Sequence, residues 1–228
     1  MVTPLKVEFQ FDFGSPSAYL AELALAGIER RTGVKFEYVS VLLGGIYKAT
    51  NNMSPAESLR GIRNKPEYQA LETQRFIRRH NITKFRQNPL FPVNTLMLMR
   101  GAVAAQFEGV FEPYFRAAYH HMWEEPKKMD DLEVFRSAFI SSGIDIEKLM
   151  ARAQQDEVKK KLIELTTDAV NRGAFGSPTR PEIATRGLSA SGGYPRLERP
   201  EWIIVTAAER NSRRMSCPVH STAFACSI

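Results

Sequence analysis

The sequence predicts an α/β protein in which a parallel strand–helix–strand unit is followed by a long helical block. Apolar and polar residues alternate over residues 7–13, and a second apolar stretch occupies 34–43 after a segment of helical length. From residue 66 to residue 172, most apolar residues recur at helical spacing. Two strands separated by one helix are expected to lie parallel and to be joined by a right-handed crossover.

The first strand is expected to end where a helix begins. Its sequence VEFQFDF has one apolar face, and Gly14 stops the alternation. Ser15 is suited to cap the helix, because its hydroxyl can accept from a free backbone N–H, and Pro16 is suited to the first helical position. A hydroxyl is therefore expected at the carboxyl end of a strand and the amino end of a helix, where anions and ligands bind. From this pattern alone, Ser15 can equally be a simple helix cap.

The remainder of the first unit ends in a segment that favours a loop. The helix after Pro16 continues to Arg31, and Gly33 ends it. Residues 44–55, after the second strand, contain several turn-forming residues and predict a polar loop. Asn51 and Asn52 lie in this loop and are candidates for binding a ligand, although a plain connection also explains them.

The middle of the chain is expected to be helical. The expected helices span 66–80, 95–107, 111–123, 132–142, 146–153 and 157–172. His120 and His121 are adjacent and point to different helical faces, and no third ligand has metal spacing around them, so we expect them to be structural and expect no metal site. Pro178 follows a glycine-containing turn and is a candidate for a cis peptide bond, although only about 5–6% of such bonds are cis.

Composition excludes several classes of function. The chain of 228 residues carries a formal charge of +6, but no basic run is interleaved with aromatic residues, so we expect no nucleic-acid partner. No apolar run reaches the roughly 18 residues that span a membrane, and the amino terminus shows no signal-peptide pattern. Cys217 and Cys226 are the only cysteines, which argues against a disulfide framework and favours a cytoplasmic location.

Four stretches, in this order and spacing, resemble the 2-hydroxychromene-2-carboxylate isomerase family. They are DFGSPSAY at 12–19, LGGIYKATNN at 43–52, PLFPVNT at 89–95 and GAFGSPT at 173–179. That family is related to kappa-class glutathione transferases and, more distantly, to DsbA-type thiol–disulfide oxidoreductases. The resemblance covers about residues 7–179. It implies a thioredoxin-like domain, formed by 1–50 and 160–228, with an all-helical domain inserted over 51–159.

The resemblance also implies a cofactor and site residues. Glutathione is the implied cofactor, and Ser15 matches the family's catalytic serine, where DsbA-type relatives carry the first cysteine of their redox pair. Asn52 and Lys65 match positions that help to hold glutathione or substrate. Ser177, before the candidate cis Pro178, matches the residue whose backbone pairs with the cysteinyl part of glutathione. The family resemblance further suggests a homodimer.

A mechanistic hypothesis connects these residues. A hydroxyl at a helix amino terminus can donate to a bound thiolate and lower the pKa of that thiol. The glutathione thiolate would then add reversibly to a conjugated carbon of an opened chromene carboxylate, rotation about the resulting single bond would follow, and expulsion of the thiolate would leave the trans benzylidenepyruvate. Lys48, Lys65 or Asn52 would hold this aromatic carboxylate substrate. One alternative is a kappa-like glutathione transferase that forms a stable conjugate. Another is a glutathione-binding protein without turnover.

The resemblance stops after Thr179. The family expects a hydrophobic strand, a second strand, and an Asp-Arg pair at the start of a last helix, whereas this chain has Pro181 and the pair Gly192–Gly193. Only residues 202–206 (WIIVT) are typical of a strand. We therefore expect the carboxyl-terminal strands and last helix of the thioredoxin-like fold to be disrupted, by a shift of reading frame just past Thr179; a divergent but selected tail is the alternative.

Overall fold

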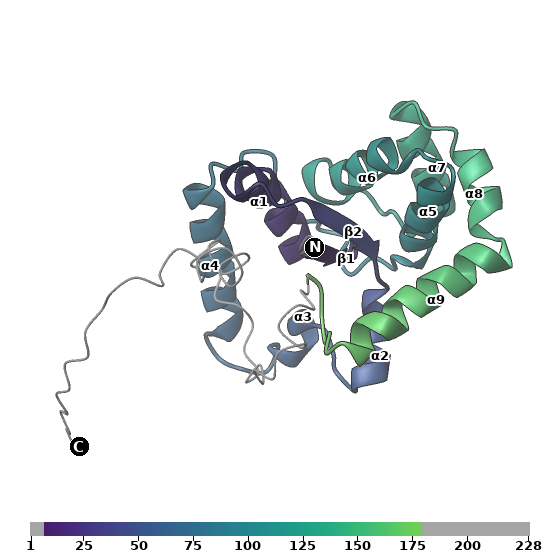
Figure 1. Cartoon of the computed structure of the whole chain (residues 1–228). Coiled ribbons are helices and arrows are strands. Elements are labelled where there is room, and N and C mark those ends of the chain that lie inside the picture. The colour runs from purple at the N-terminus through teal and green to yellow at the C-terminus, as the bar shows by residue number, and fades with distance from the viewer. Residues whose placement is uncertain (1–6, 179–228) are drawn as a thin grey trace, which may run out of the picture.

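The computed structural model describes residues 7–178, which form two short strands and a series of helices around them (Figure 1). In chain order the elements are β1 (Val7–Phe11), α1 (Pro16–Thr32), β2 (Phe36–Ser40), α2 (Leu43–Thr50), α3 (Pro55–Ser58), α4 (Lys65–Arg79), α5 (Leu96–Phe107), α6 (Phe111–Tyr119), the π-helix η1 (His120–Glu124), α7 (Leu132–Ser141), α8 (Ile146–Ala153) and α9 (Asp156–Asn171).

The two strands pair as the sequence predicts. β1 and β2 are parallel, with Val7 opposite Phe36 and Phe11 opposite Ser40, so the parallel strand–helix–strand unit is confirmed. The start of α1 is also confirmed, because the Ser15 hydroxyl accepts from the backbone N–H of Ala18 over 3.1 Å. At the other end Gly33 adopts a left-handed conformation with φ 72°, which glycine reaches without steric cost.

Both faces of the two-stranded sheet are covered, which corrects the expectation of a single apolar face. One face packs into the main core with α1, α5 and α6, and Phe11 there is fully buried. The other face packs against α2 and α9, where Val41, Ile46 and Ala169 form a smaller core. The polar residues Gln10 and Asp12 face this second layer and are therefore fully buried as well.

The predicted loop at 44–55 is wrong, because residues 43–50 form helix α2. Leu42, the residue before it, makes no side-chain cap. Instead the carboxylate of Asp12, at the end of β1, accepts from the Leu43 N–H over 2.7 Å. The helix therefore depends on a cap from a distant residue, which local sequence could not reveal.

The helical block surrounds α5. Figure 1 shows α5 to α8 gathered on one side of the two strands, with α4 on the opposite side beyond α1. Helix α6 approaches α5 closely at Gly101, where an added Cβ would lie 2.1 Å from the Tyr114 hydroxyl oxygen. The expected helices are confirmed except at 120–124, where the backbone widens into the π-helix η1.

Several predictions fall on residues 179–228, outside the described part of the chain. These are the disrupted carboxyl-terminal strands and helix, the frame-shifted tail, the strand-like segment 202–206, and both cysteines. The division into 1–50 with 160–228 and an inserted 51–159 domain stays a prediction. Within residues 7–178, no helix is both long and apolar enough to cross a bilayer.

Candidate functional site

Ser15 lies at the junction between β1 and α1, as the sequence predicts. Its side chain is 5% exposed. The hydroxyl donates to the backbone carbonyl oxygen of Ser177 over 2.7 Å while it accepts from the Ala18 N–H. No acidic residue stands in the first turn of α1, so the positive end of the helix dipole there is not neutralised within the helix.

The segment after α9 returns to the end of β1 and faces Ser15. The Ser177–Pro178 peptide bond is cis, which confirms the prediction for Pro178. The Ser177 hydroxyl accepts from the backbone N–H of Asp12 over 3.1 Å and lies 3.4 Å from the carbonyl oxygen of Gln10. Ser15 and Ser177, which are 162 positions apart in sequence, are therefore held against one another by a direct hydrogen bond.

Asp12 holds this junction together, and the sequence motif gave it no role. Its carboxylate accepts from the Gly14 N–H over 2.8 Å, from the Leu43 N–H over 2.7 Å and from the Thr95 hydroxyl over 3.1 Å. Burial raises the pKa of the Asp12 carboxyl, against these three hydrogen bonds, which lower it. A polar residue two positions before Gly14 was the available signal, but two of its three partners, Leu43 and Thr95, lie on other segments.

Asn52 contacts the same returning segment. Its side-chain amide donates to the carbonyl oxygen of Phe175 over 2.9 Å, and its side-chain oxygen accepts from the Met53 N–H. The preceding Asn51 ends α2 in a left-handed conformation with φ 52°. Asn52 is therefore bonded to a residue that lies two positions before Ser177 along the chain, whereas Asn51 ends the helix.

The two predicted lysines are exposed. Lys48 lies in the last turn of α2, and Lys65 is the first residue of α4. No hydrogen bond or ion pair joins either side chain to another residue of the range 7–178. A hydrogen bond thus joins Ser15 to Ser177, which precedes cis Pro178, and another joins Asn52 to Phe175 of the same segment, whereas neither lysine ammonium group has a partner among residues 7–178.

Two cavities lie elsewhere, along α5. One, of about 390 Å³, lies between α5 and α8 and is lined by Met97 and Leu149; the other, of about 420 Å³, lies between α2, α5 and α9. Arg100 lines both cavities, and Ser15 and Ser177 line neither. The substrate site predicted at Ser15 is therefore distinct from these two hollows.

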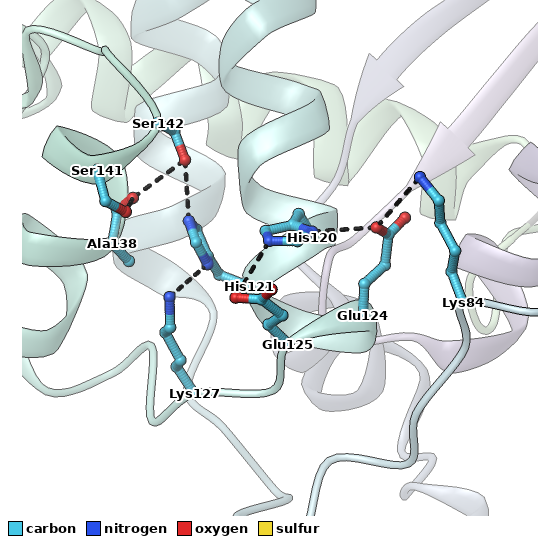
Figure 2. A network of polar contacts seen from close by, with 9 residues as sticks. All are labelled: Lys84, His120, His121, Glu124, Glu125, Lys127, Ala138, Ser141 and Ser142. Carbon is cyan, nitrogen blue, oxygen red and sulfur yellow. Dashed lines mark hydrogen bonds and ion pairs between the residues drawn. The ribbon is translucent and has the colours of Figure 1, made fainter.

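A second polar network surrounds η1 (Figure 2). The expectation that His120 and His121 lack a third ligand is wrong, because the Glu125 carboxylate joins them in a group whose ligand atoms all lie within 4.8 Å of one another. Burial, followed by the charges of Lys127 and His120, lowers the pKa of His121 to about 4.

The sequence profile described as "DSBA-like thioredoxin domain" matches residues 6–180. The chain belongs to the DSBA-like thioredoxin domain family. This DSBA-like protein is similar in sequence to the 2-hydroxychromene-2-carboxylate isomerase of Sphingobium xenophagum, with 26% identity over 178 residues that cover 75% of this chain and 86% of the relative. It is 27% identical to the enzyme of the same name from Pseudomonas putida over 178 residues, 76% of this chain and 83% of the relative.

A solved structure of a 2-hydroxychromene-2-carboxylate isomerase matches the DSBA-like protein with a TM-score of 0.64 and 23% identity. The match covers 77% of this chain and 84% of that one. The thioredoxin-like fold with helical additions is thereby confirmed, as is the resemblance drawn from the four sequence motifs.

Proposed function

We propose that this DSBA-like protein is a glutathione-dependent isomerase. The proposed reaction converts 2-hydroxychromene-2-carboxylate, or a related aromatic catabolite, into trans-o-hydroxybenzylidenepyruvate. The observation that carries the proposal is the Ser15 hydroxyl at the amino end of α1, 2.7 Å from the carbonyl oxygen that precedes cis Pro178. The names of the two similar enzymes support the same reaction.

The residue at the helix start favours non-redox over redox chemistry. Thiol–disulfide exchange needs a protein cysteine as attacking thiolate, and this position is a serine. A serine hydroxyl can instead donate a hydrogen bond to a sulfur anion, and the dipole of α1 acts in the same direction. Both effects favour the charged form of a bound thiol and therefore lower its pKa.

The residues around Ser15 fit glutathione, which is a peptide with a thiol in its middle. The carbonyl oxygen of Ser177 can accept from the ligand's backbone, and no residue within 7–178 accepts from the Ser177 N–H. The Asn52 amide, already bonded to Phe175 of the same segment, can reach a ligand on this edge with little rearrangement. Lys65 offers an ammonium group for one of the ligand's carboxylates.

The protein's own residues have three tasks in this reaction. When bound, glutathione supplies the thiolate that adds reversibly to a conjugated carbon and so makes rotation about the former double bond possible. Ser15 keeps the glutathione sulfur charged. Ser177 and Asn52 hold the peptide backbone of glutathione in one orientation. Lys48 is proposed to bind the substrate carboxylate, because its ammonium group is exposed in the last turn of α2 and has no partner among the described residues.

Product analysis tests the proposal. Purified protein, glutathione and 2-hydroxychromene-2-carboxylate are expected to yield the trans isomer with no net consumption of glutathione. A stable glutathione conjugate would instead identify a kappa-like transferase.

A binding protein without turnover is the remaining alternative, and one observation favours it. Ser15 is only 5% exposed and its hydroxyl is engaged with Ser177, so a ligand must displace an existing hydrogen bond before Ser15 can act. Calorimetric binding of glutathione with neither isomer nor conjugate formed would support this alternative. The cytoplasmic location and the homodimer stay predictions.

A further inference from the structure

The π-helix η1 gathers two adjacent histidines and one carboxylate. The ring centroids of His120 and His121 lie 4.8 Å apart, although neighbouring residues of a regular helix point in different directions. One ligand atom from each of His120, His121 and Glu125 lies within 4.8 Å of the other two. Single turns of π-helix are frequent at functional sites.

One ring nitrogen of His121, Nε2, is held by the hydroxyl group of Ser142 and is called the outer nitrogen here. Ser142 donates to the Ala138 carbonyl oxygen over 3.1 Å, so its oxygen accepts from His121 Nε2 at 2.9 Å. This assigns the proton of the neutral ring to Nε2 and leaves a lone pair on Nδ1. Nδ1 lies 2.8 Å from Lys127 Nζ, which donates to it. Figure 2 shows this chain from Ala138 through His121 to Lys127.

The outer nitrogen of His120 is fixed by a carboxylate. His120 Nδ1 lies 3.0 Å from Glu124, whose other oxygen accepts from the Tyr19 hydroxyl over 2.9 Å. The inner nitrogen, Nε2, lies 3.4 Å from the Glu125 carboxylate. Metal-binding histidines are held in this way, with the outer N–H donated to a carboxylate or another acceptor and the inner lone pair directed at the metal.

We propose that His120, His121 and Glu125 bind a divalent transition metal ion, with Zn²⁺ as the probe, in exchange for the ammonium group of Lys127. Two imidazole nitrogens and one carboxylate oxygen form a ligand set that Zn²⁺ accepts, with water in the fourth position. Two ligands of a tetrahedral zinc ion lie about 3.4 Å apart, so His120 and Glu125 are already correctly spaced. The three ligand atoms lie within 4.8 Å of one another, so the longest separation must shorten by up to about 1.4 Å to complete the set.

Lys127 and solvent access determine how the ion enters. His121 is buried, whereas His120 is half-buried and Glu125 is exposed, so the ion can reach the ligands from the solvent side. The Lys127 ammonium group occupies the lone pair that the metal needs, which makes Lys127 a direct competitor. Removal of its charge is therefore expected to tighten metal binding.

The test is a zinc titration of the full chain after treatment with a chelator. Because Cys217 and Cys226 can bind zinc themselves, all variants carry Cys217→Ser and Cys226→Ser. One Zn²⁺ per chain is expected; His120→Ala and Glu125→Gln should each weaken binding at least ~10-fold, and Lys127→Met should strengthen it at least ~10-fold. His80→Ala is the matched control and should leave the affinity unchanged.

Cobalt provides a second readout that does not depend on affinity alone. Co²⁺ bound by two histidines, one carboxylate and water should give the intense visible absorption of a tetrahedral site, and His120→Ala should abolish it. The proposal is overturned if Lys127→Met binds no zinc, or if His120→Ala and Glu125→Gln bind it as tightly as the parent. His121→Ala is not needed, so a folding defect at that buried position does not obscure the result.

Discussion

Ser15 Oγ donates to the carbonyl oxygen of Ser177 over 2.7 Å, and this bond joins the start of α1 to the segment that carries cis Pro178. The same hydroxyl oxygen accepts from the Ala18 N–H and so caps the helix with a lone pair. Its proton, which is donated to Ser177, can be donated to another acceptor without loss of this cap. A bound thiolate therefore has to replace Ser177 as the acceptor. Ser15 can exchange acceptors by rotation of the O–H bond without losing its capping role.

Ser15→Ala should lower turnover far more than it weakens glutathione binding. Removal of one hydrogen-bond donor to a reacting anion typically lowers kcat by about 10²–10³-fold. The Kd of glutathione should change by less than ~10-fold, because the backbone contacts at Ser177 remain. Steady-state kinetics and calorimetry measure the two quantities.

A control is needed because Ser15→Ala also removes a helix cap. Loss of such a cap costs about 1 kcal/mol of the free energy of unfolding. Asp131 caps α7 by accepting from Glu133 and Val134, and Asp131→Ala provides a matched loss of capping at another helix. If Asp131→Ala lowers turnover as strongly as Ser15→Ala, the role assigned to Ser15 is wrong.

Asn52→Ala should weaken glutathione binding by about 10-fold, because one hydrogen bond of about 1.4 kcal/mol is lost and the segment near Phe175 is released. Asn51→Gly is the neighbouring control. Asn51 has a positive φ that glycine adopts readily, so this change should alter neither binding nor stability appreciably. A similar loss of affinity in both variants would remove Asn52 from the binding site.

Asp12→Asn should destabilise the protein by about 2–3 kcal/mol at acidic pH. The amide NH₂ of asparagine cannot accept a hydrogen bond, so at least one of the three donors that the carboxyl group satisfies loses its acceptor. Burial raises the folded-state pKa of Asp12 above 3.8. A raised acid pKa means that the folded state binds more protons than the unfolded state. The stability that the Asp12 carboxyl group contributes is therefore complete below its pKa in the unfolded state. It is lost as the pH rises through its pKa in the folded state.

The pH dependence gives Asp12→Asn a distinctive signature. The stability gap between wild type and Asp12→Asn should narrow as pH rises above the unfolded pKa of 3.8. Urea denaturation of both proteins across this pH range measures the gap. A gap that widens with pH would mean that the buried carboxylate is stabilised, rather than penalised, in its ionised form.

Gly101→Ala should destabilise the protein although alanine is the better helix former by about 1 kcal/mol. An added Cβ would lie 2.6 Å from Cζ of Tyr114, which is fully buried and donates to the Leu98 carbonyl. Overpacking of this kind costs about 1–3 kcal/mol, so the net effect should be a loss of stability. Thermal unfolding measures it, and an unchanged or raised Tm would show that α5 and α6 separate without penalty.

Local sequence predicted the elements whose signals are local. The alternation before Gly14, the Ser15–Pro16 helix start and Gly33 fix β1, α1 and the turn after α1 through neighbouring residues alone. The cis bond at Pro178 was only a candidate by local pattern. It gained support when the motif was considered together with three others along the chain.

The parts that sequence did not reveal depend on a distant partner or on irregular helix geometry. Helix α2 is capped by Asp12, from a different segment, so its own glycine-containing sequence favoured a loop. Glu125 joins His120 only because η1 departs from regular helical geometry. For α2 the deciding contact lies outside the local window over which residue periodicity is measured. For Glu125 the five-residue spacing lies within that window but does not match the 3.6-residue period of an α-helix.

The pKa of the bound glutathione thiol reports whether the Ser15 hydroxyl stabilises the sulfur anion. Ultraviolet absorption of the thiolate, followed over pH in saturated wild type and in Ser15→Ala, gives this pKa in each protein. The free thiol has a pKa of about 8.5, and the pKa of the thiol in the wild-type complex should be about two units lower. In the Ser15→Ala complex the thiol pKa should rise most of the way back to the value of the free thiol. An identical thiol pKa in the two complexes would show that the Ser15 hydroxyl does not stabilise the sulfur anion.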